Sequence, residues 1–132
     1  MRKFLLFLLL LVSQGGVMMA QEVNEGEVGI QVLDTPPEFN GGLNALMQYL
    51  SMNIRYPQSA QRHGIQGRVI VQFIVDKTGK VGKIEIMKSL CHSCDKEAVR
   101  VVKNMPRWSP GMKDGKPVNA RYTLPINFVL PN

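Results

Sequence analysis

Alternation of apolar with other residues, which is typical of a half-buried β-strand, is clearest in the middle of the chain. The stretch GRVIVQFIVDKTGKVGKIEIMKS, residues 67–89, contains two alternating runs on either side of Asp76–Gly79. Asp-Lys-Thr-Gly has the composition of a tight turn, in which Gly79 is free to adopt a positive φ. The pattern therefore predicts a β-hairpin over residues 67–89.

A third alternating run, ARYTLPINFVL, covers residues 120–130 and contains Pro125. Proline has no N–H to donate to a sheet and is confined to edge strands, strand starts and bulges. We therefore expect a final strand at a sheet edge, with Pro125 directed to the unpaired side. In that register Thr123 and Asn127 also direct their backbone groups outward. The residues expected to pack under helices are Tyr122, Leu124, Ile126, Phe128 and Leu130.

Two other segments show the three- and four-residue spacing of amphipathic helices. The first follows Gly41-Gly42 and ends at Tyr56-Pro57, because the residue before proline disfavours the α region; its apolar stripe is Leu43, Leu46, Met47, Leu50 and Ile54. A further short helical turn is expected before Gly64. The second helix lies in DKEAVRVVKNMP, residues 95–106, with the stripe Ala98, Val101, Val102 and Met105. Residues 107–119, which include Trp108, are expected to form a loop.

The order helix, strand, strand, helix, strand predicts an α+β domain. In it, two helices pack on one face of a three-stranded antiparallel sheet with strand order 2-1-3. The last strand lies beside the first and keeps one side unpaired. Such an edge can accept an extended peptide as an additional strand.

The first twenty residues have the layout of a secretory signal peptide, in which Arg2 and Lys3 precede an apolar run from Phe4 to Val12. That run is about half of the roughly 20 residues that a membrane-spanning helix needs. We expect cleavage after Ala20, with an uncleaved membrane anchor as the alternative. The expected organisation is a signal peptide over 1–20, a flexible leader with one short strand near 28–33 over 21–37, and a domain over 38–132.

The formal net charge of +6 falls to +4 when Arg2 and Lys3 leave with the signal peptide. The remaining basic residues are scattered along the chain, and an exported protein does not meet nucleic acid inside the cell. Nucleic acid is therefore not an expected partner.

Cys91 and Cys94 form a C-x-x-C motif between a predicted strand and a predicted helix, which is the local layout of thiol–disulfide redox sites. Cys94 lies four residues before Ala98 and so falls on the buried stripe of that helix. A small structural disulfide, which an oxidising compartment allows, is therefore the alternative. A thioredoxin-like domain would also need a βαβ unit ahead of the motif, and here a hairpin precedes it.

Other enzyme, metal and cofactor motifs are missing from the sequence. The spacing of His63 and His92 relative to the two cysteines matches no common zinc pattern. Asp95 stands where a c-type haem attachment would need histidine. The sequence has no nucleophile elbow and no glycine-rich phosphate loop. We therefore expect a protein that is not an enzyme and holds neither metal nor cofactor.

Several spaced motifs resemble the C-terminal domain of TonB energy transducers, especially the version common in Bacteroidetes. They are Tyr56-Pro57, GIQG at 64–67, the turn at 76–79, WSPG at 108–111 and GKPV at 115–118, and EFNGG at 38–42 is similar to a segment that precedes the first helix of such proteins. The resemblance covers about residues 37–130. It implies a two-helix, three-strand periplasmic domain whose last strand pairs with the TonB box of outer-membrane transporters.

Carried over by position, the resemblance implies a partner-binding site. Its residues are Arg121, Tyr122, Thr123, Leu124, Pro125, Ile126, Asn127 and Phe128, with Tyr56 and Pro57 nearby. The expected function is binding of TonB-box segments by strand addition in transport across the outer membrane. A full transducer has an uncleaved membrane helix and a long spacer, so coupling of this chain alone to the inner-membrane proton-driven complex is not expected.

Three alternatives remain open. An uncleaved N-terminal segment would make the chain a membrane-anchored minor transducer. The pair Cys91 and Cys94 would serve a periplasmic thiol–disulfide protein. An open edge can also pair with a second copy of itself, which would give a homodimer through the last strand.

Overall fold

The computed structural model describes residues 21–22 and 33–131. The expected signal peptide at 1–20, and all but the last residue of the strand expected at 28–33, lie outside these residues. The helices are α2 (Gly42–Asn53), α3 (Gln58–Arg62) and α4 (His92–Lys103). The strands are β1 (Gln21–Glu22), β2 (Gly67–Val75), β3 (Val81–Lys88), β4 (Gly111–Lys113), β5 (Lys116–Val118) and β6 (Ala120–Phe128).

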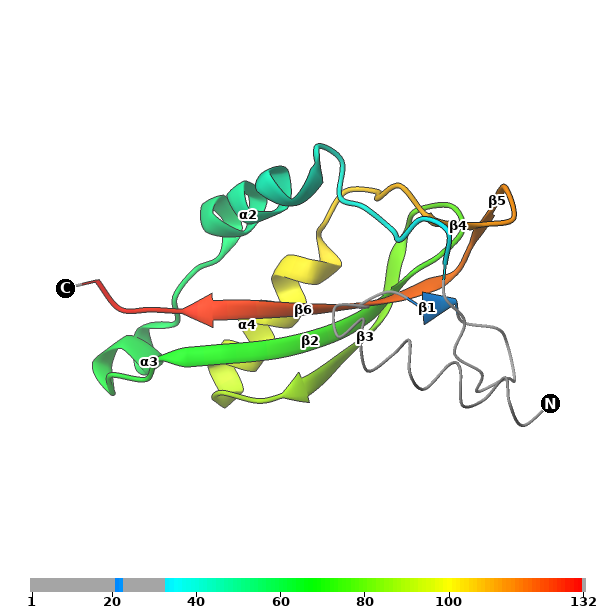
Figure 1. Cartoon of the computed structure of the whole chain (residues 1–132). Coiled ribbons are helices and arrows are strands. Elements are labelled where there is room, and N and C mark those ends of the chain that lie inside the picture. Colours follow the sequence, from blue (N-terminus) through cyan, green and yellow to red (C-terminus); the bar gives the residue numbers. More distant parts are fainter. Residues whose placement is uncertain (1–20, 23–32, 132) are drawn as a thin grey trace, which may run out of the picture.

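The main sheet has the order β1-β6-β2-β3, and each neighbouring pair is antiparallel (Figure 1). β2 and β6 pair along their whole lengths, from Gly67 opposite Phe128 to Val75 opposite Ala120. The predicted hairpin is β2 and β3, and the predicted order 2-1-3 is the order β3-β2-β6. The α+β fold class is thus confirmed. The two-residue strand β1 was not predicted.

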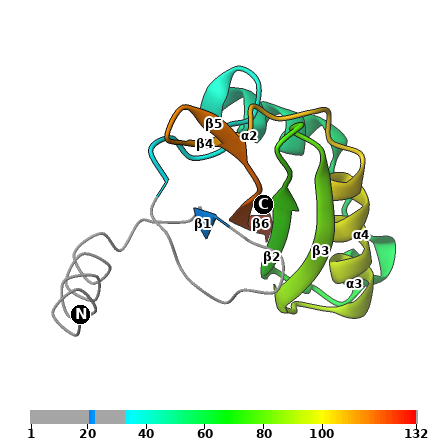
Figure 2. The ribbon, with the colours of Figure 1, turned by 90° about the vertical axis from the view of Figure 1, so that its right-hand side faces the viewer.

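The helices lie on one face of this sheet, as Figure 2 shows, and the core lies between the two layers. Alternate residues of β2 and β6 point into the core because successive side chains of a strand face opposite sides. Val69, Val71, Phe73 and Val75 of β2 are completely buried. They meet a matching set on β6, Leu124, Ile126 and Phe128, and the α4 set Ala98, Val101 and Val102.

α4 begins at His92, which is earlier than the Asp95 start of the predicted segment, because Cys91 caps it. The Cys94 backbone N–H donates to Cys91 Sγ over 3.1 Å, which satisfies one of the free donors of the first turn. Asp95 adds an acidic residue to that turn, where the helix dipole favours negative charge.

The apolar stripe predicted for α2 divides into buried and exposed residues. Leu46 and Leu50 are in the core, whereas the side chains of Leu43 and Met47 are 65% and 51% exposed. In Figure 1, α2 lies above β6 at the top of the molecule. Its buried residues are Leu46 and Leu50, so the helix meets the core along only part of its surface. Tyr49 fastens α2 to α4 by donating its hydroxyl to the carbonyl of Val101 over 2.9 Å. Burial raises the pKa of this tyrosine.

The loop predicted for residues 107–119 is partly wrong, because it contains the small hairpin β4–β5. Asp114 and Gly115 form its turn with φ of 53° and 76°. Asp-Gly with two positive φ values is the preferred chemistry of a two-residue hairpin, but strands of three residues carry too little alternation to be recognised.

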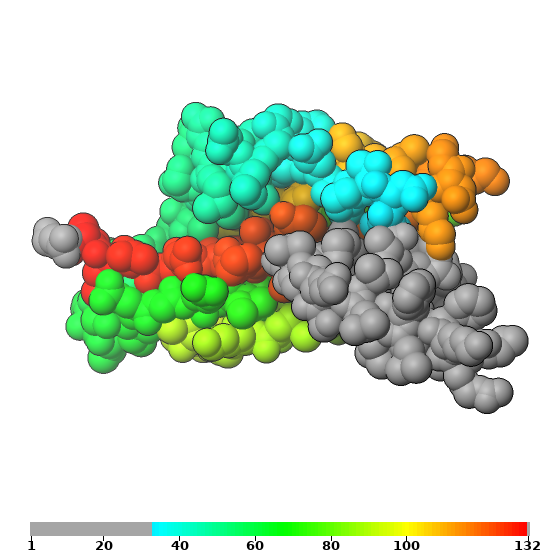
Figure 3. All heavy atoms as spheres, in the orientation of Figure 1, coloured from blue at the N-terminus to red at the C-terminus, as the bar shows by residue number. Residues whose placement is uncertain are grey.

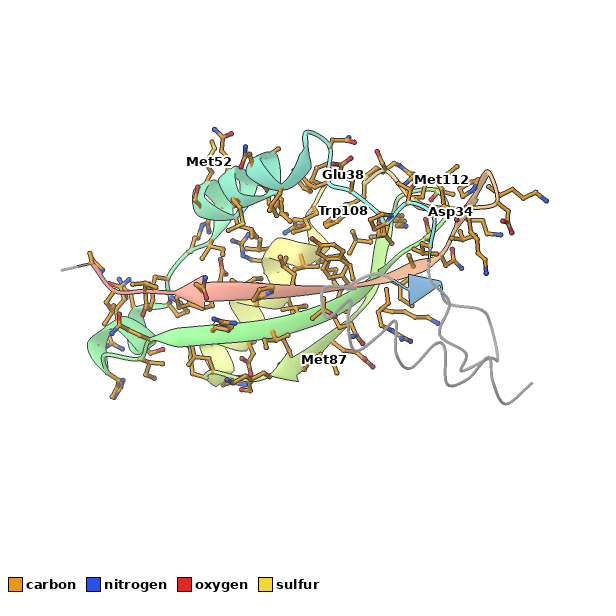
Figure 4. All side chains as sticks on the ribbon, in the orientation of Figure 1. Asp34, Glu38, Met52, Met87, Trp108 and Met112 are labelled. Atoms are coloured by element: carbon orange, nitrogen blue, oxygen red, sulfur yellow. A yellow bond between two sulfur atoms is a disulfide. The ribbon has the colours of Figure 1, made fainter. Side chains whose placement is uncertain are left out.

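Residues 33–39 pack against this end of the domain. Leu33 and Phe39 are each 7% exposed, and isolated bridges join Thr35 to Met112 and Glu38 to Ser109. Figure 4 shows Asp34 and Glu38 at the same end of the molecule as Met112 and Trp108. The packed part of the chain therefore extends N-terminal of residue 38, where the domain was expected to begin.

Candidate functional site

The outer side of β6 is the strongest candidate for a binding site. Pro125 lies opposite Ile70 and cannot donate to it, so this is a non-hydrogen-bonded pair whose backbone groups point away from each other. Thr123 and Asn127, two residues to either side, have the same orientation because the pattern alternates. Backbone groups of all three residues therefore face away from β2.

β1 pairs with the first part of this outer side, with Gln21 opposite Arg121 and Glu22 opposite Ala120. Beyond Arg121, no other strand among the described residues pairs with β6 on that side. Figure 3 shows β6 lying at the surface between α2 and β2. Within the described part of the chain, the stretch from Tyr122 to Phe128 thus has no strand on its outer side, and we call it the open edge.

A groove of about 290 Å³ borders the C-terminal half of the open edge. From α2 and the segment after it, the groove is lined by Met47, Leu50, Ser51, Ile54 and Tyr56. From β6 and the following residue, it is lined by Pro125, Ile126, Asn127, Phe128 and Val129. Two of these apolar side chains are well exposed, Met47 at 51% and Val129 at 69%. The groove thus offers apolar surface directly beside the outward-facing backbone groups of β6.

Tyr56 and Phe128 give this groove a fixed wall. Their rings meet edge to face with centroids 5.6 Å apart. The Tyr56 hydroxyl donates to the carbonyl of Ile65, which fixes the ring at both ends. A groove with a rigid wall loses little conformational entropy when it takes a ligand.

Of the site residues carried over from the resemblance, the structure gathers one part at the groove: Tyr56, Pro125, Ile126, Asn127 and Phe128. The rest lie elsewhere. Arg121 is opposite Gln21, the Thr123 hydroxyl accepts from Gln72 Nε2 over 3.1 Å on the sheet face away from the helices, and Leu124 is in the core. Pro57 is the N-cap residue of α3 and does not line the groove.

Tyr122 belongs to an aromatic cluster and not to the groove. Its ring centroid lies 4.9 Å from that of Trp108 and 5.7 Å from that of Phe73. Burial raises the pKa of its hydroxyl. Through these ring contacts, Tyr122 fixes the start of the open edge to the aromatic cluster.

Sequence reasoning missed the α2 contribution to the groove, above all Met47, and also Val129. A signal was present, since the apolar stripe of α2 has more members than a helix at the side of a small sheet can bury. The excess residues were assigned to the core because apolar spacing does not distinguish a core face from a binding face.

The opposite edge of the sheet, β3, is protected against strand pairing. Its pairing with β2 has register shifts at Ile70/Val71 and between Gln72 and Ile74, and Lys83 has a φ of 48°. Irregular pairing and lysines at an edge both hinder the addition of another strand. This difference between the two sides makes β6 the edge suited to a partner.

Cys91 and Cys94 are joined by a disulfide at the first turn of α4. Among residues 21–22 and 33–131, no cluster of three or more His, Cys, Asp or Glu side chains could hold a metal ion. Within the same ranges, no helix has both the length and the apolar content to span a membrane.

These features define a small α+β domain that presents the open edge of β6 beside an apolar groove, an arrangement suited to strand addition. The chain belongs to the family described as Gram-negative bacterial TonB protein C-terminal, which it matches over residues 52–130.

Individual relatives agree with this assignment. Protein TonB of Vibrio cholerae serotype O1 is 34% identical over 77 residues, which are 58% of this chain and 31% of that protein. The chain thus matches about a third of the length of that relative. A solution structure of Helicobacter pylori TonB-CTD is 26% identical with a TM-score of 0.50, and the match covers 67% of this chain and 94% of that one. A longer form of that domain, 24% identical with a TM-score of 0.51, shares the fold over 71% of this chain and 90% of its own.

Proposed function

We propose that this domain binds the TonB box of outer-membrane transporters by adding it as a strand to β6, in TonB-dependent transport across the outer membrane. The observation that carries the proposal is the open edge, which lies beside an apolar groove while the other edge of the sheet is irregular. In strand addition the main chain supplies affinity and alternate side chains supply specificity.

The hydrogen-bonding groups of the open edge set the form of the complex. Thr123 and Asn127 each offer an N–H and a C=O, whereas Pro125 offers only a C=O. A bound peptide therefore meets two outward donors separated by a position without one. Because an intramolecular hydrogen bond contributes about 1 kcal/mol net, each outward donor is expected to change affinity by roughly fivefold.

The groove supports a preference for apolar peptide side chains. Alternate side chains of an added strand that face the helix side would meet Met47 and Val129, both well exposed in the free domain. Covering this surface supplies the hydrophobic part of the binding free energy. Peptides with a charged side chain facing Met47 and Val129 are expected to bind more weakly, since the groove would remove water from the charged group.

The test is a backbone NMR titration of the isotopically labelled protein with TonB-box peptides from transporters of the same organism. We expect shifts concentrated in residues 121–130. Asn127→Pro removes one outward N–H without touching the ladder to β2, and should weaken binding about fivefold or more. Asn127→Ala keeps that N–H and is the matched control. Equal binding by both variants, or shifts elsewhere, would contradict strand addition at β6.

Another copy of the chain is the second candidate for the open edge. Pairing of two copies there would give a homodimer through β6. The same unpaired groups that would bind a peptide can pair edge to edge. Sedimentation across a range of concentrations would distinguish the two. The dimer would be favoured if the mass of the parent protein doubles as its concentration rises while the Asn127→Pro variant keeps the mass of a monomer.

We also propose that the protein acts in the periplasm after removal of residues 1–20, on the basis of the signal-like N-terminal sequence. The intact mass of the protein isolated from cells tests this. An intact mass equal to that of residues 21–132 supports export with cleavage. A mass that includes residues 1–20 would favour a membrane-anchored transducer.

A further inference from the structure

The disulfide at the start of α4 connects two residues of very different exposure. Cys94 is completely buried under the helix, whereas Cys91, the N-cap residue, is partly exposed. Of the two residues, Cys91 is therefore the one that a reactive partner can approach from solvent. Exchange at a disulfide depends on which sulfur is accessible and on how well the other leaves.

Local donors are placed to hold negative charge on Cys91 Sγ. The Cys94 backbone N–H points to it at 3.1 Å, and the hydroxyl of Ser93 lies 3.4 Å away. Both belong to the first turn of a twelve-residue helix, whose N-terminal end favours an anion. A thiolate formed at Cys91 would thus have two partners in place.

Asp95 is the charge that opposes a thiolate at this position. Its carboxylate is held by other groups, since Oδ1 accepts the Leu90 N–H over 3.1 Å and Oδ2 accepts the Ser89 hydroxyl. These bonds direct the carboxylate oxygens toward Ser89 and Leu90, just after β3. The neighbouring side chain of His92 is exposed.

The bridge contributes little to holding the fold together. It spans a sequence separation of three, within one helical turn, and so joins no two separate elements. The stabilisation that a disulfide gives by restricting the unfolded chain is smallest for such short loops. α4 is already fixed by Ala98, Val101 and Val102 in the core and by the Tyr49 bond to Val101.

We propose that Cys91 and Cys94 form a thiol–disulfide exchange site that oxidises a dithiol of a partner protein. A thiolate of the partner attacks Cys91 Sγ, the Cys91–Cys94 bond breaks, and its electron pair leaves on Cys94 Sγ, which takes up a proton. The second thiolate of the partner then attacks its own sulfur in the mixed disulfide and releases Cys91 as a thiolate. The partner loses two electrons and becomes a disulfide, and the protein pair gains them.

The first experiment uses the purified protein with dithiothreitol as the dithiol probe, followed by iodoacetamide and peptide mass spectrometry. We expect millimolar dithiothreitol to open the bridge while the fold, followed by amide NMR, stays intact. Cys91 should then be alkylated at least about tenfold faster than Cys94, because reactivity follows thiolate character and exposure. A bridge that opens only with unfolding, or equal labelling of both residues, would overturn the proposal.

Two variants test the division of roles. Cys94→Ala leaves Cys91 without its resolving partner and should accumulate a mixed disulfide with glutathione when oxidised glutathione is added. Cys91→Ser keeps an acceptor at the N-cap, since serine is among the preferred N-cap residues, and should form no such adduct at the buried Cys94. Adducts on Cys91→Ser, or none on Cys94→Ala, would contradict the assignment. Binding of TonB-box peptides should be the same for Cys91→Ser and the parent, so this proposal and the proposed function fail separately.

Discussion

At the scale of single residues, Gly79 shows how one position joins the central hairpin to the aromatic core. The Asp76 carboxylate organises the turn by accepting from the backbone N–H groups of Thr78 and Lys80, and Gly79 follows with a φ of 90°. The Trp108 N–H donates to the Gly79 carbonyl over 2.8 Å. A Cβ at Gly79 would lie 2.1 Å from the carbonyl oxygen of Trp108.

Gly79→Ala should therefore lower the free energy of unfolding by about 3 kcal/mol or more, from the positive φ and the backbone clash together. Gly64→Ala is the matched control, because Gly64 also has a positive φ, 63°, but no atom lies within 4 Å of its added Cβ. That variant should lose only about 1 kcal/mol. Urea unfolding of both variants measures the difference, and equal losses would show that the Trp108 contact is unimportant.

The turn and the positive φ of Gly79 were predictable because they depend only on the neighbouring residues Asp-Lys-Thr-Gly. The sequence did not predict the contact with Trp108, which comes from a loop distant along the chain. Similarly, Pro125 indicated an edge strand from the local chemistry of proline. The position of Met47 in the groove beside it depends on tertiary packing. Local residues thus specified the edge, and only the fold located the groove.

At the scale of elements, α2 is both a core helix and a wall of the groove. Its residues Met47 and Met52 are 51% and 74% exposed, but only Met47 lines the groove. Figure 4 shows Met52 pointing away from the sheet. The two methionines therefore form a matched pair on one helix.

Met47→Ser should weaken binding of an apolar peptide several-fold, since it removes apolar surface that the peptide would cover, at about 25 cal/mol per Å². Met52→Ser should leave the affinity unchanged. Isothermal titration calorimetry with one TonB-box peptide measures both, and the thermal unfolding midpoint checks that neither exposed substitution disturbs the fold. If Met52→Ser weakens binding as much as Met47→Ser, the groove is not where the peptide lies.

A second element-scale feature is the connection between α4 and the chain that leaves α2. Glu97 accepts the Arg55 backbone N–H over 2.7 Å and pairs with Arg100, which in turn donates to the carbonyl of Asn53 over 2.8 Å. The hydrogen bond from the Arg100 side chain lowers the pKa of Glu97, and the Arg55 N–H adds to this against the effect of burial.

Because its pKa is lower in the folded state, Glu97 stabilises the fold above the pKa of the unfolded chain, and this contribution is lost as the pH falls through the folded pKa. Glu97→Gln should therefore lower stability modestly at pH 7. The difference from the parent should shrink as the pH falls from the unperturbed glutamate pKa of about 4.3 through the lower pKa of Glu97 in the folded protein. Urea unfolding at several pH values measures this, with the exposed Glu85→Gln as control. A difference that persists undiminished at pH 2 would mean that the charge is not responsible.

Long amphipathic elements were predictable because their period is repeated several times, as in β2, β3 and α4. The short hairpin β4–β5 and the two-residue β1 were not, since three or fewer residues carry no period. The α2 stripe was identified correctly, but its partial exposure depends on how far the helix overhangs β6. That property belongs to the assembled layers and not to the helix.

At the scale of the whole molecule, the N-terminal approach to the domain is part of its packing. Leu33 packs with Ala120, and Phe39 enters the aromatic cluster with ring centroids 5.5 Å from Tyr49 and 5.6 Å from Trp108. Backbone bonds between Glu38 and Ser109 run in both directions, at 2.9 and 2.8 Å. Packed residues thus lie on both sides of residue 38, where the domain is expected to begin.

Two shortened chains test where the folded unit begins. A chain that starts at Leu33 should unfold with the same free energy as one that starts at Gln21. It should bind a TonB-box peptide no more than about fivefold more tightly, since β1 pairs with only two residues of β6, Ala120 and Arg121, which precede the open edge. A chain that starts at Asn40 loses Phe39 and the Glu38–Ser109 bonds and should be less stable by about 3 kcal/mol or more, the usual cost of removing a buried phenylalanine side chain. Urea unfolding and the same NMR titration measure both properties. Equal stability of the two chains would place the start of the folded unit at α2. A much larger gain in affinity for the chain that starts at Leu33 would mean that the segment before Leu33 competes with the peptide for the open edge.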